Sequence, residues 1–150
     1  SGIERINAIL NSKNNSYTDI GCYQATDLID DIMHEFQKEK LNLQVNSNFW
    51  VYGSKEGIKT VISNLVRNAI KYAGEHATIS ITLNKGNEII VEDNGFGIAP
   101  AVKKEIFKSN VTTAGHGYGL TLCKKIIDDH QGTITCHSEI DKGTKFVIRL

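Results

Sequence analysis

The sequence predicts an α+β fold, a two-layer sandwich in which about three main helices cover one face of a mixed sheet of about five strands. Helical and extended segments follow one another in mixed order, and two pairs of short strands are joined by tight polar turns. The chain has 150 residues, 40% of them hydrophobic, which is enough for one domain with a real core. The hairpins favour this sandwich over a doubly wound parallel sheet.

The composition excludes several classes of function. The 17 basic and 17 acidic residues give a net charge of zero, so neither nucleic acid nor an anionic membrane is expected as the main partner. Cys22, Cys123 and Cys136 are widely spaced, which predicts reduced thiols of a cytosolic protein, two of them in the core. No apolar run approaches the ~18 residues of a membrane span, and no signal peptide is visible. The chain begins with Ser-Gly, and we interpret it as an excised piece of a longer protein.

The first elements are short. Residues 1–16 carry a brief apolar pattern and then Asn and Ser residues, which predicts the end of an arriving helix and a linker. Residues 17–23 predict a strand, and residues 26–39 predict an amphipathic helix. The alternation over residues 41–45 and the extended residues 49–52 predict two more strands.

Residues 54–73 predict the central helix of the domain. Ser54 suits the N-cap, Glu56 suits the first turn, and Gly74 follows where the helix should end. An apolar stripe at helical spacing comprises Ile58, Val61, Ile62, Leu65, Val66, Ala69 and Ile70. We therefore expect this helix to lie against the sheet.

Four polar residues lie beside that stripe. Asn64, Asn68, Lys71 and Tyr72 share one edge of the helix. An amide oxygen can bind Mg²⁺, an ammonium can bind phosphate, and a ring can pack on a base. This edge predicts a magnesium-nucleotide site, although the same residues taken alone also fit an ordinary polar border.

The second half of the chain alternates hairpins and helices. Residues 79–93 predict a hairpin, and Pro100 suits the first turn of a short helix that runs to residue 107. Residues 108–118 predict a loop, followed by a helix that ends near Gly132. Residues 133–150 predict the second hairpin.

Asp93 ends a predicted strand in phase with Ile89 and Val91, so its carboxylate should face the core side. Such a carboxylate needs hydrogen-bond donors, and an exocyclic amine such as adenine N6 would serve. Gly95 and Gly97 allow a sharp turn and the close approach of a ligand. Taken alone, this Asp-Gly pattern is also typical of an ordinary turn.

Gly115, Gly117 and Gly119 alternate just before a predicted helix that begins near Leu120. Backbone N–H groups at a helix start can hold phosphate, although such a run is also typical of a flexible linker. It is not a Walker loop, since no Gly-Lys-Ser/Thr follows, and it lies outside a βαβ unit.

Together these segments resemble the boxes of sensor histidine kinases. Residues 64–72 resemble their asparagine box, and residues 93–98 and 115–120 resemble their two glycine boxes. Residues 106–107 resemble part of the phenylalanine box, and residues 143–144 match a late Gly-Thr. The boxes span most of the chain in the expected order. The sequence is therefore identified as the catalytic ATP-binding domain of a two-component histidine kinase, with the Bergerat fold of the GHKL superfamily.

The resemblance implies a role for each site residue. Asn68 would bind Mg²⁺ between the ATP phosphates, with Asn64 nearby as a second candidate ligand. Lys71 would reach a phosphate, and these three are the expected catalytic residues. Tyr72 would pack on adenine, and Asp93 would accept a hydrogen bond from adenine N6.

The remaining implied contacts come from the glycine boxes and the late Gly-Thr. Thr144 would help to hold adenine, through water, and residues 108–118 would form a lid over the ATP. The base pocket would be shaped by Gly95, Gly97 and Ile98. The phosphates would be wrapped by Gly115, His116, Gly117, Tyr118, Gly119 and Leu120.

The type of residue at position 64 distinguishes two classes of enzyme with this fold. In ATP-hydrolysing relatives a glutamate at this place activates water, and a neutral amide cannot act as that base. The resemblance therefore implies transfer of the γ-phosphoryl group to a histidine. The alternatives are an ATP-hydrolysing switch, a nucleotide-binding regulatory module with little or no transfer activity and, more distantly, a serine-directed kinase.

None of the five histidines has the context of a phosphoacceptor. The acceptor is expected on a separate helical dimerisation domain, whose last turns and linker would be residues 1–16, and the catalytic domain would be residues 17–150. The implied partners are that helical domain and a response regulator or receiver domain. The fragment would be monomeric, and the full-length protein would be a homodimeric, membrane-attached sensor with this domain in the cytoplasm.

Three departures from the family lie in the lid region. Asn110 occupies the second phenylalanine position of the phenylalanine box, and Tyr118 replaces the usual leucine of the second glycine box. Beyond Lys108 the lid contains no lysine or arginine.

Overall fold

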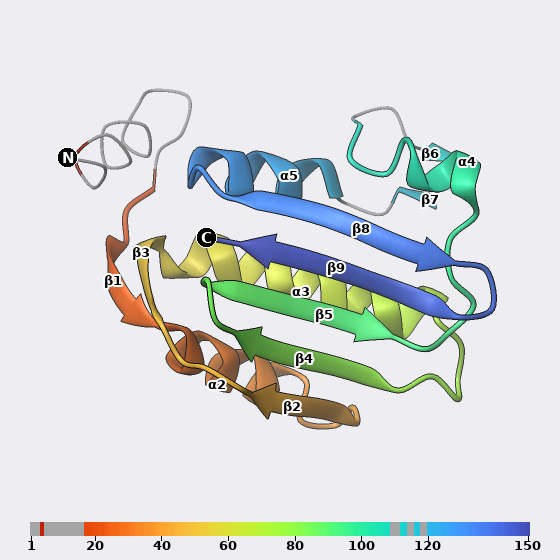
Figure 1. Ribbon diagram of the computed structural model, residues 1–150, viewed down its shortest axis with the longest axis horizontal. Coiled ribbons are helices and arrows are strands. Elements are labelled where there is room, and N and C mark those ends of the chain that lie inside the picture. The colour runs from red at the N-terminus through yellow and green to blue at the C-terminus, as the bar shows by residue number, and fades with distance from the viewer. Residues whose placement is uncertain (1–3, 5–16, 109–111, 114–115, 118–119) are drawn as a thin grey trace.

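The computed structural model describes residues 4, 17–108, 112–113, 116–117 and 120–150. Its main feature is a five-stranded sheet that lies in front of the helices in Figure 1. In spatial order the strands are β2 (Leu41–Val45), β4 (Ile79–Asn84), β5 (Glu88–Asp93), β9 (Gly143–Arg149) and β8 (Thr133–Glu139). Only the pairing of β2 with β4 is parallel among these strands, so the sheet is mixed, as predicted.

Three main helices lie on one side of this sheet (Figure 1). They are α2 (Ala25–Glu35), α3 (Lys55–Tyr72) and α5 (Leu120–Asp129). Helix α3 lies between the other two and packs on the central strands, while the short α4 (Pro100–Lys103) lies beside β8. The predicted two-layer α+β sandwich is confirmed.

Helix α3 begins as the sequence predicts. The Ser54 hydroxyl accepts a hydrogen bond from the Gly57 N–H at 2.9 Å, which satisfies one of the orphan donors of the first turn. Gly74 follows the helix with a φ of +102°, a conformation that favours glycine. The stripe is buried except for Ile70, which is 38% exposed, so that part of the prediction was wrong. At about 100° per residue, Ile70 lies on the border of the stripe rather than on its centre line.

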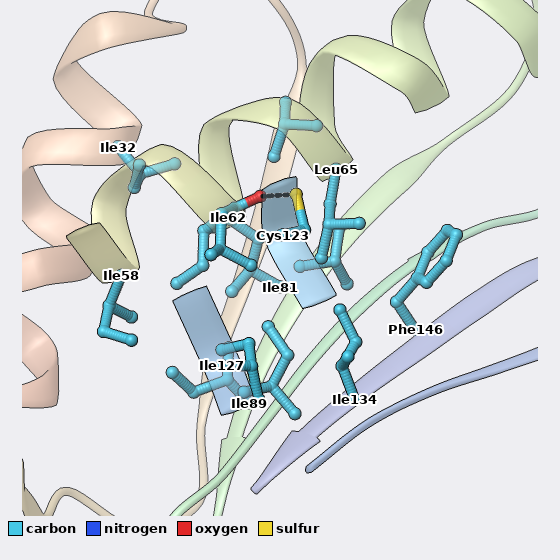
Figure 2. Close-up of a cluster of buried hydrophobic side chains, with 14 of the residues drawn as sticks. Ile32, Ile58, Ile62, Leu65, Ile81, Ile89, Cys123, Ile127, Ile134 and Phe146 are labelled. Atoms are coloured by element: carbon cyan, nitrogen blue, oxygen red, sulfur yellow. Dashed lines mark hydrogen bonds between the residues drawn. The ribbon is translucent and has the colours of Figure 1, made fainter. Parts of the chain in front are cut away.

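Figure 2 shows how the two layers meet. Ile58, Ile62 and Leu65 of α3 point toward side chains of the sheet and of α5. Cys123 of α5 is fully buried among them, and its thiol lies 3.8 Å from the Val61 carbonyl oxygen. All three cysteines are free thiols, with Cys123 buried, Cys136 partly buried and Cys22 exposed.

Two of the first three strands lie outside the five-stranded sheet. β1 (Ile20–Gln24) pairs antiparallel with β3 (Trp50–Ser54) in a separate two-stranded sheet. β2 forms as predicted at the edge of the five-stranded sheet, but its Leu43 and Val45 are 39% and 45% exposed. Alternation identifies a strand, but it cannot show whether another layer covers it.

Several boundaries also differ from the prediction. The short helix α4 ends at Lys103, four residues before the predicted end at residue 107. Helix α2 ends at Glu35, four residues before the predicted end. Within the predicted loop, β6 (Thr112–Thr113) pairs with β7 (His116–Gly117). Strands of two residues are too short to carry a recognisable hydrophobic period.

Candidate functional site

A pocket lies between the C-terminal half of α3 and strands β5 and β9. It is lined by Leu65, Asn68, Ala69, Tyr72, Ala73, Val91, Asp93, Gly97, Ile98, Thr144 and Phe146. Residues from the asparagine box, the first glycine box and the late Gly-Thr therefore meet in one hollow.

Asp93 is the charged group of this pocket. It is the last residue of β5 and lies opposite Thr144 of β9, on the face that packs against α3. Its Oδ1 accepts a hydrogen bond from the Gly95 N–H at 2.9 Å. Burial raises the pKa of Asp93, although backbone N–H groups of Gly95 and Thr144 act in the opposite direction. A carboxylate in this position favours a ligand that brings its own hydrogen-bond donor.

Three glycines let backbone segments meet beside Asp93. A Cβ on Gly95 would collide with the Ala73 carbonyl group, and a Cβ on Gly97 would collide with that of Glu139. Gly143, with a φ of +107°, lies so close to the Asp93 backbone that a side chain would not fit. These contacts explain why the predicted turn residues are glycines.

Ser138 of β8 connects the segments at this end of the pocket, and it was not predicted as a site residue. Its hydroxyl oxygen lies 2.8 Å from the Ile98 nitrogen, 2.9 Å from the Gly143 carbonyl oxygen and 2.9 Å from Thr144 Oγ1. These bonds join the first glycine box to the start of β9. A serine in an alternating strand has no distinctive local pattern, so only the cross-strand pairing reveals it.

The apolar walls were also not predicted as site residues. Leu65 and Ala69 belong to the helical stripe, and Val91 and Phe146 are paired across β5 and β9. Periodicity assigned them to the core. The signal that could have identified them is their spacing, because each lies within one helical turn, or two strand residues, of a predicted polar site residue. Phe107 of the phenylalanine box packs edge-on against Phe146, with ring centroids 6.3 Å apart.

The polar side chains along this edge of α3 point in two different directions. Asn68 and Tyr72 line the pocket, and the Lys71 ammonium lies 5.0 Å from the centre of the Tyr72 ring. Asn64 is directed toward α5, where its amide nitrogen lies 3.8 Å from the Cys123 sulfur. Asn68 is thus the better placed of the two predicted metal ligands.

The amide oxygen of Asn68, which lines the pocket, is chemically suited to bind Mg²⁺. Among the described residues, no group of three or more His, Cys, Asp or Glu side chains is arranged to hold a metal ion. Mg²⁺ that travels with a nucleotide takes most of its ligands from phosphates and water and needs only one or two from the protein. The residues present fit that arrangement.

The second glycine box is only partly described. Gly115, Tyr118 and Gly119 lie outside the described residues, as does Asn110. The backbone of His116 and Gly117 forms β7. Leu120 begins α5 and is buried as a whole residue, 1% exposed, as part of the core.

The arrangement defines a nucleotide-binding domain of the α+β sandwich type. Apolar walls and an aromatic ring suit a planar base, and the carboxylate suits an exocyclic amine. Asn68 lines the pocket and Lys71 lies beside the Tyr72 ring, and an amide oxygen and an ammonium group are chemically suited to a metal ion and to phosphate. The chain belongs to the family of histidine kinase-, DNA gyrase B-, and HSP90-like ATPases, whose model matches residues 53–150.

Within that family the chain is a histidine kinase domain. It is 34% identical over 146 residues to the sensor protein RprX of Bacteroides fragilis, covering 84% of this chain and 28% of RprX. It is 33% identical over 117 residues to the CAI-1 autoinducer sensor kinase/phosphatase CqsS of Vibrio cholerae, covering 74% of this chain and 17% of CqsS. The chain thus spans less than a third of either relative.

Solved structures agree with this assignment. The catalytic domain of histidine kinase ThkA has a TM-score of 0.75 and 27% identity, with 89% of this chain and 97% of that one covered. The mycobacterial sensor histidine kinase MprB has a TM-score of 0.75 at 21% identity, with 87% and 96% covered, and shows the shared fold. Among the residues that the structure describes, no helix combines the length and apolar character needed to cross a membrane.

Proposed function

We propose that this domain binds Mg–ATP in the pocket beside α3 and transfers the γ-phosphoryl group to a histidine on a separate helical domain. The observation that carries the proposal is Asp93, a half-buried carboxylate in a pocket with apolar walls. An adenine amino group satisfies such an acceptor, and Tyr72 offers a ring for the base. The family match to ATPases and the likeness to a histidine kinase catalytic domain support the same conclusion.

Each residue then has a defined task. Asp93 orients the base and Ile98 closes the pocket around it, while Thr144 adds a second polar contact. Asn68 holds the metal side of the phosphates, and Lys71 neutralises phosphate charge. Mg²⁺, when bound with the nucleotide, neutralises further charge on the phosphates.

Asn64 favours transfer over hydrolysis. Hydrolysis by relatives of this fold needs a general base to activate water, and an amide cannot serve as one. The amide of Asn64 is also directed toward Cys123 rather than into the pocket. A histidine acceptor is already nucleophilic and has less need of such a base.

The acceptor histidine is proposed to lie outside this domain. His130 is 5% exposed, and both of its ring nitrogens are engaged, one by the Ser54 N–H at 3.0 Å and one by the Ile126 carbonyl at 2.8 Å. His34, His76 and His137 are exposed but lie away from the lining of the pocket. We therefore expect the chain alone to bind ATP without phosphorylating itself.

The binding test is a calorimetric titration with Mg–ADP and with a non-hydrolysable Mg–ATP analogue. The parent chain is compared with Asp93→Asn and with Glu92→Gln, a matched control whose side chain is exposed one residue away. We expect the parent and the control to bind both nucleotides and Asp93→Asn to bind both much more weakly. A folded parent that binds neither nucleotide would overturn the proposal.

The transfer test uses radiolabelled ATP and the helical histidine-bearing domain of a sensor kinase as acceptor. Label should reach the acceptor only when this chain is present. Steady ATP hydrolysis by the chain alone would instead indicate the ATP-hydrolysing switch. Tight ATP binding without any transfer would indicate the regulatory module.

We further propose that the whole protein is a homodimeric, membrane-attached sensor with this domain in the cytoplasm, and that it passes the phosphoryl group to a response regulator or receiver domain. The names of CqsS and RprX as sensor proteins support this assignment.

A further inference from the structure

Ser138 occupies the centre of a small hydrogen-bond network at the base end of the pocket. It lies on β8 directly opposite Thr144 of β9. Its hydroxyl oxygen is within hydrogen-bond distance of the Ile98 N–H, the Gly143 carbonyl and the Thr144 hydroxyl, at 2.8, 2.9 and 2.9 Å. Three partners fill the hydrogen-bonding capacity of a hydroxyl group.

The chemistry of the three partners fixes the position of each proton. The Ile98 N–H can only donate, and the Gly143 carbonyl can only accept. The single proton of Ser138 therefore points to Gly143, while one lone pair receives the Ile98 N–H. The contact with Thr144 must then use the proton of the Thr144 hydroxyl.

This arrangement has a consequence for the pocket. Because the Thr144 proton is directed to Ser138, Thr144 presents only lone pairs to a ligand. Asp93, as a carboxylate, also presents only lone pairs. The two polar side chains at the base end thus both require a donor. A purine with an amino group at position 6 supplies one, whereas a 6-oxo purine presents a carbonyl oxygen there.

We propose that Ser138 is a positioning residue that sets the polarity of Thr144 and thereby makes the pocket prefer 6-amino over 6-oxo purine nucleotides. The inference rests on the proposed binding of a nucleotide at this pocket. Without the Ser138 hydroxyl, Thr144 can rotate and donate its proton into the pocket, where it meets the oxygen of a 6-oxo base.

The test is a calorimetric comparison of Mg–ADP with Mg–IDP, the inosine nucleotide, which differs at position 6 and carries no extra group at position 2. The parent should prefer ADP, and Ser138→Ala should reduce the ratio of the ADP and IDP affinities by about fivefold, the equivalent of one neutral hydrogen bond. Ser138→Thr, which keeps the hydroxyl, should retain the parental ratio. If Ser138 had only a structural role, Ser138→Ala would weaken the binding of ADP and of IDP equally and leave the ratio of the two affinities unchanged.

A double-mutant cycle shows whether Ser138 acts through Thr144. Thr144→Val removes the second acceptor and should itself reduce the ratio, and adding Ser138→Ala to it should change the ratio no further. An unchanged ratio in Ser138→Ala, or an additive effect in the double variant, would overturn the inference while leaving the proposed function intact. Failure of the folded parent to bind either nucleotide would overturn both. If Ser138→Ala does not fold, an unchanged ratio in Thr144→Val overturns the inference on its own.

Discussion

Replacing Asp93 by Asn separates the contribution of this side chain to binding from its contribution to stability. The amide has nearly the same shape as the carboxyl group but no charge. The amide oxygen of the variant can accept a hydrogen bond either from the Gly95 N–H or from the ligand. In either case the NH₂ group of the amide faces the other of these two donors and cannot accept from it. One hydrogen bond is therefore lost in either orientation.

The magnitude follows from the kind of bond that is lost. A hydrogen bond to a charged group contributes about 1.5–3 kcal/mol, and a buried donor left without an acceptor costs a similar amount. Taking about 2–3 kcal/mol as the net loss, we expect adenine nucleotide affinity to fall by about 30- to 160-fold. The ligand-induced increase in the thermal unfolding temperature should fall with it.

Stability without nucleotide should respond in the opposite direction. Burial raises the pKa of Asp93, so the folded domain holds the proton more tightly than the unfolded chain does. The stability that this group contributes is fully present below the unfolded pKa and is lost as pH rises through the raised folded pKa. At neutral pH the charged form destabilises the fold, and a neutral amide removes that penalty.

The assay is thermal unfolding at pH 7 with and without Mg–ADP, on the parent, Asp93→Asn and Glu92→Gln. We expect the unliganded Asp93→Asn domain to unfold at or above the parental temperature and to show almost no response to ADP. Glu92→Gln should respond to ADP as the parent does. If Asp93→Asn unfolds at a clearly lower temperature without nucleotide, Asp93 is a structural residue and the reasoning is refuted.

Three further perturbations test other parts of the structure. Ser54→Ala removes the cap of α3, and urea unfolding should show a loss of about 1–2 kcal/mol; no loss would contradict the capping role. Burial lowers the pKa of His130, so its contribution to stability should decline as pH falls below its ordinary value of 6.5. Urea unfolding between pH 5 and 8 should show a shallower pH dependence in His130→Gln than in the parent, and equal slopes would count against this contribution. Gly143→Ala should destabilise more than Gly86→Ala and also weaken ADP binding, because both glycines have positive φ but only Gly143 is in close contact with the Asp93 backbone. Equal losses in the two variants would refute that explanation.

The elements that the sequence predicts well are those with local causes. The period of α3, its Ser54 cap and the two hairpins depend on residues within a few positions of one another, and all are present in the structure. The pairing of β1 with β3 depends on residues about 30 positions apart, and no local pattern specifies it. The contact of Asn64 with Cys123 could not be predicted for the same reason. The spacing places Asn64 on the polar edge of α3, but the contact depends on the position of α5.

The residues of the candidate site also divide into those with a local signal in the sequence and those without one. Asp93 and its glycines were predicted because a carboxylate in phase with a buried strand conflicts with its surroundings, and such conflicts mark functional positions. Ser138 creates no conflict in sequence, since a polar residue in a hairpin strand is ordinary. Its importance arises only when β8 places it opposite Thr144.

The position of the pocket follows from the length of α3. The first part of the helix buries Ile58, Ile62 and Leu65 in the core, and its last turns carry Asn68 and Tyr72 alongside the pocket. The core therefore fixes the helix at one end and leaves its other end to form the wall of the site. A carboxylate placed against this wall destabilises the unliganded fold and is stabilised when a donor arrives, so the binding of a 6-amino purine and the stability of the domain are thermodynamically linked. That linkage is the reason the two effects of Asp93→Asn must have opposite signs.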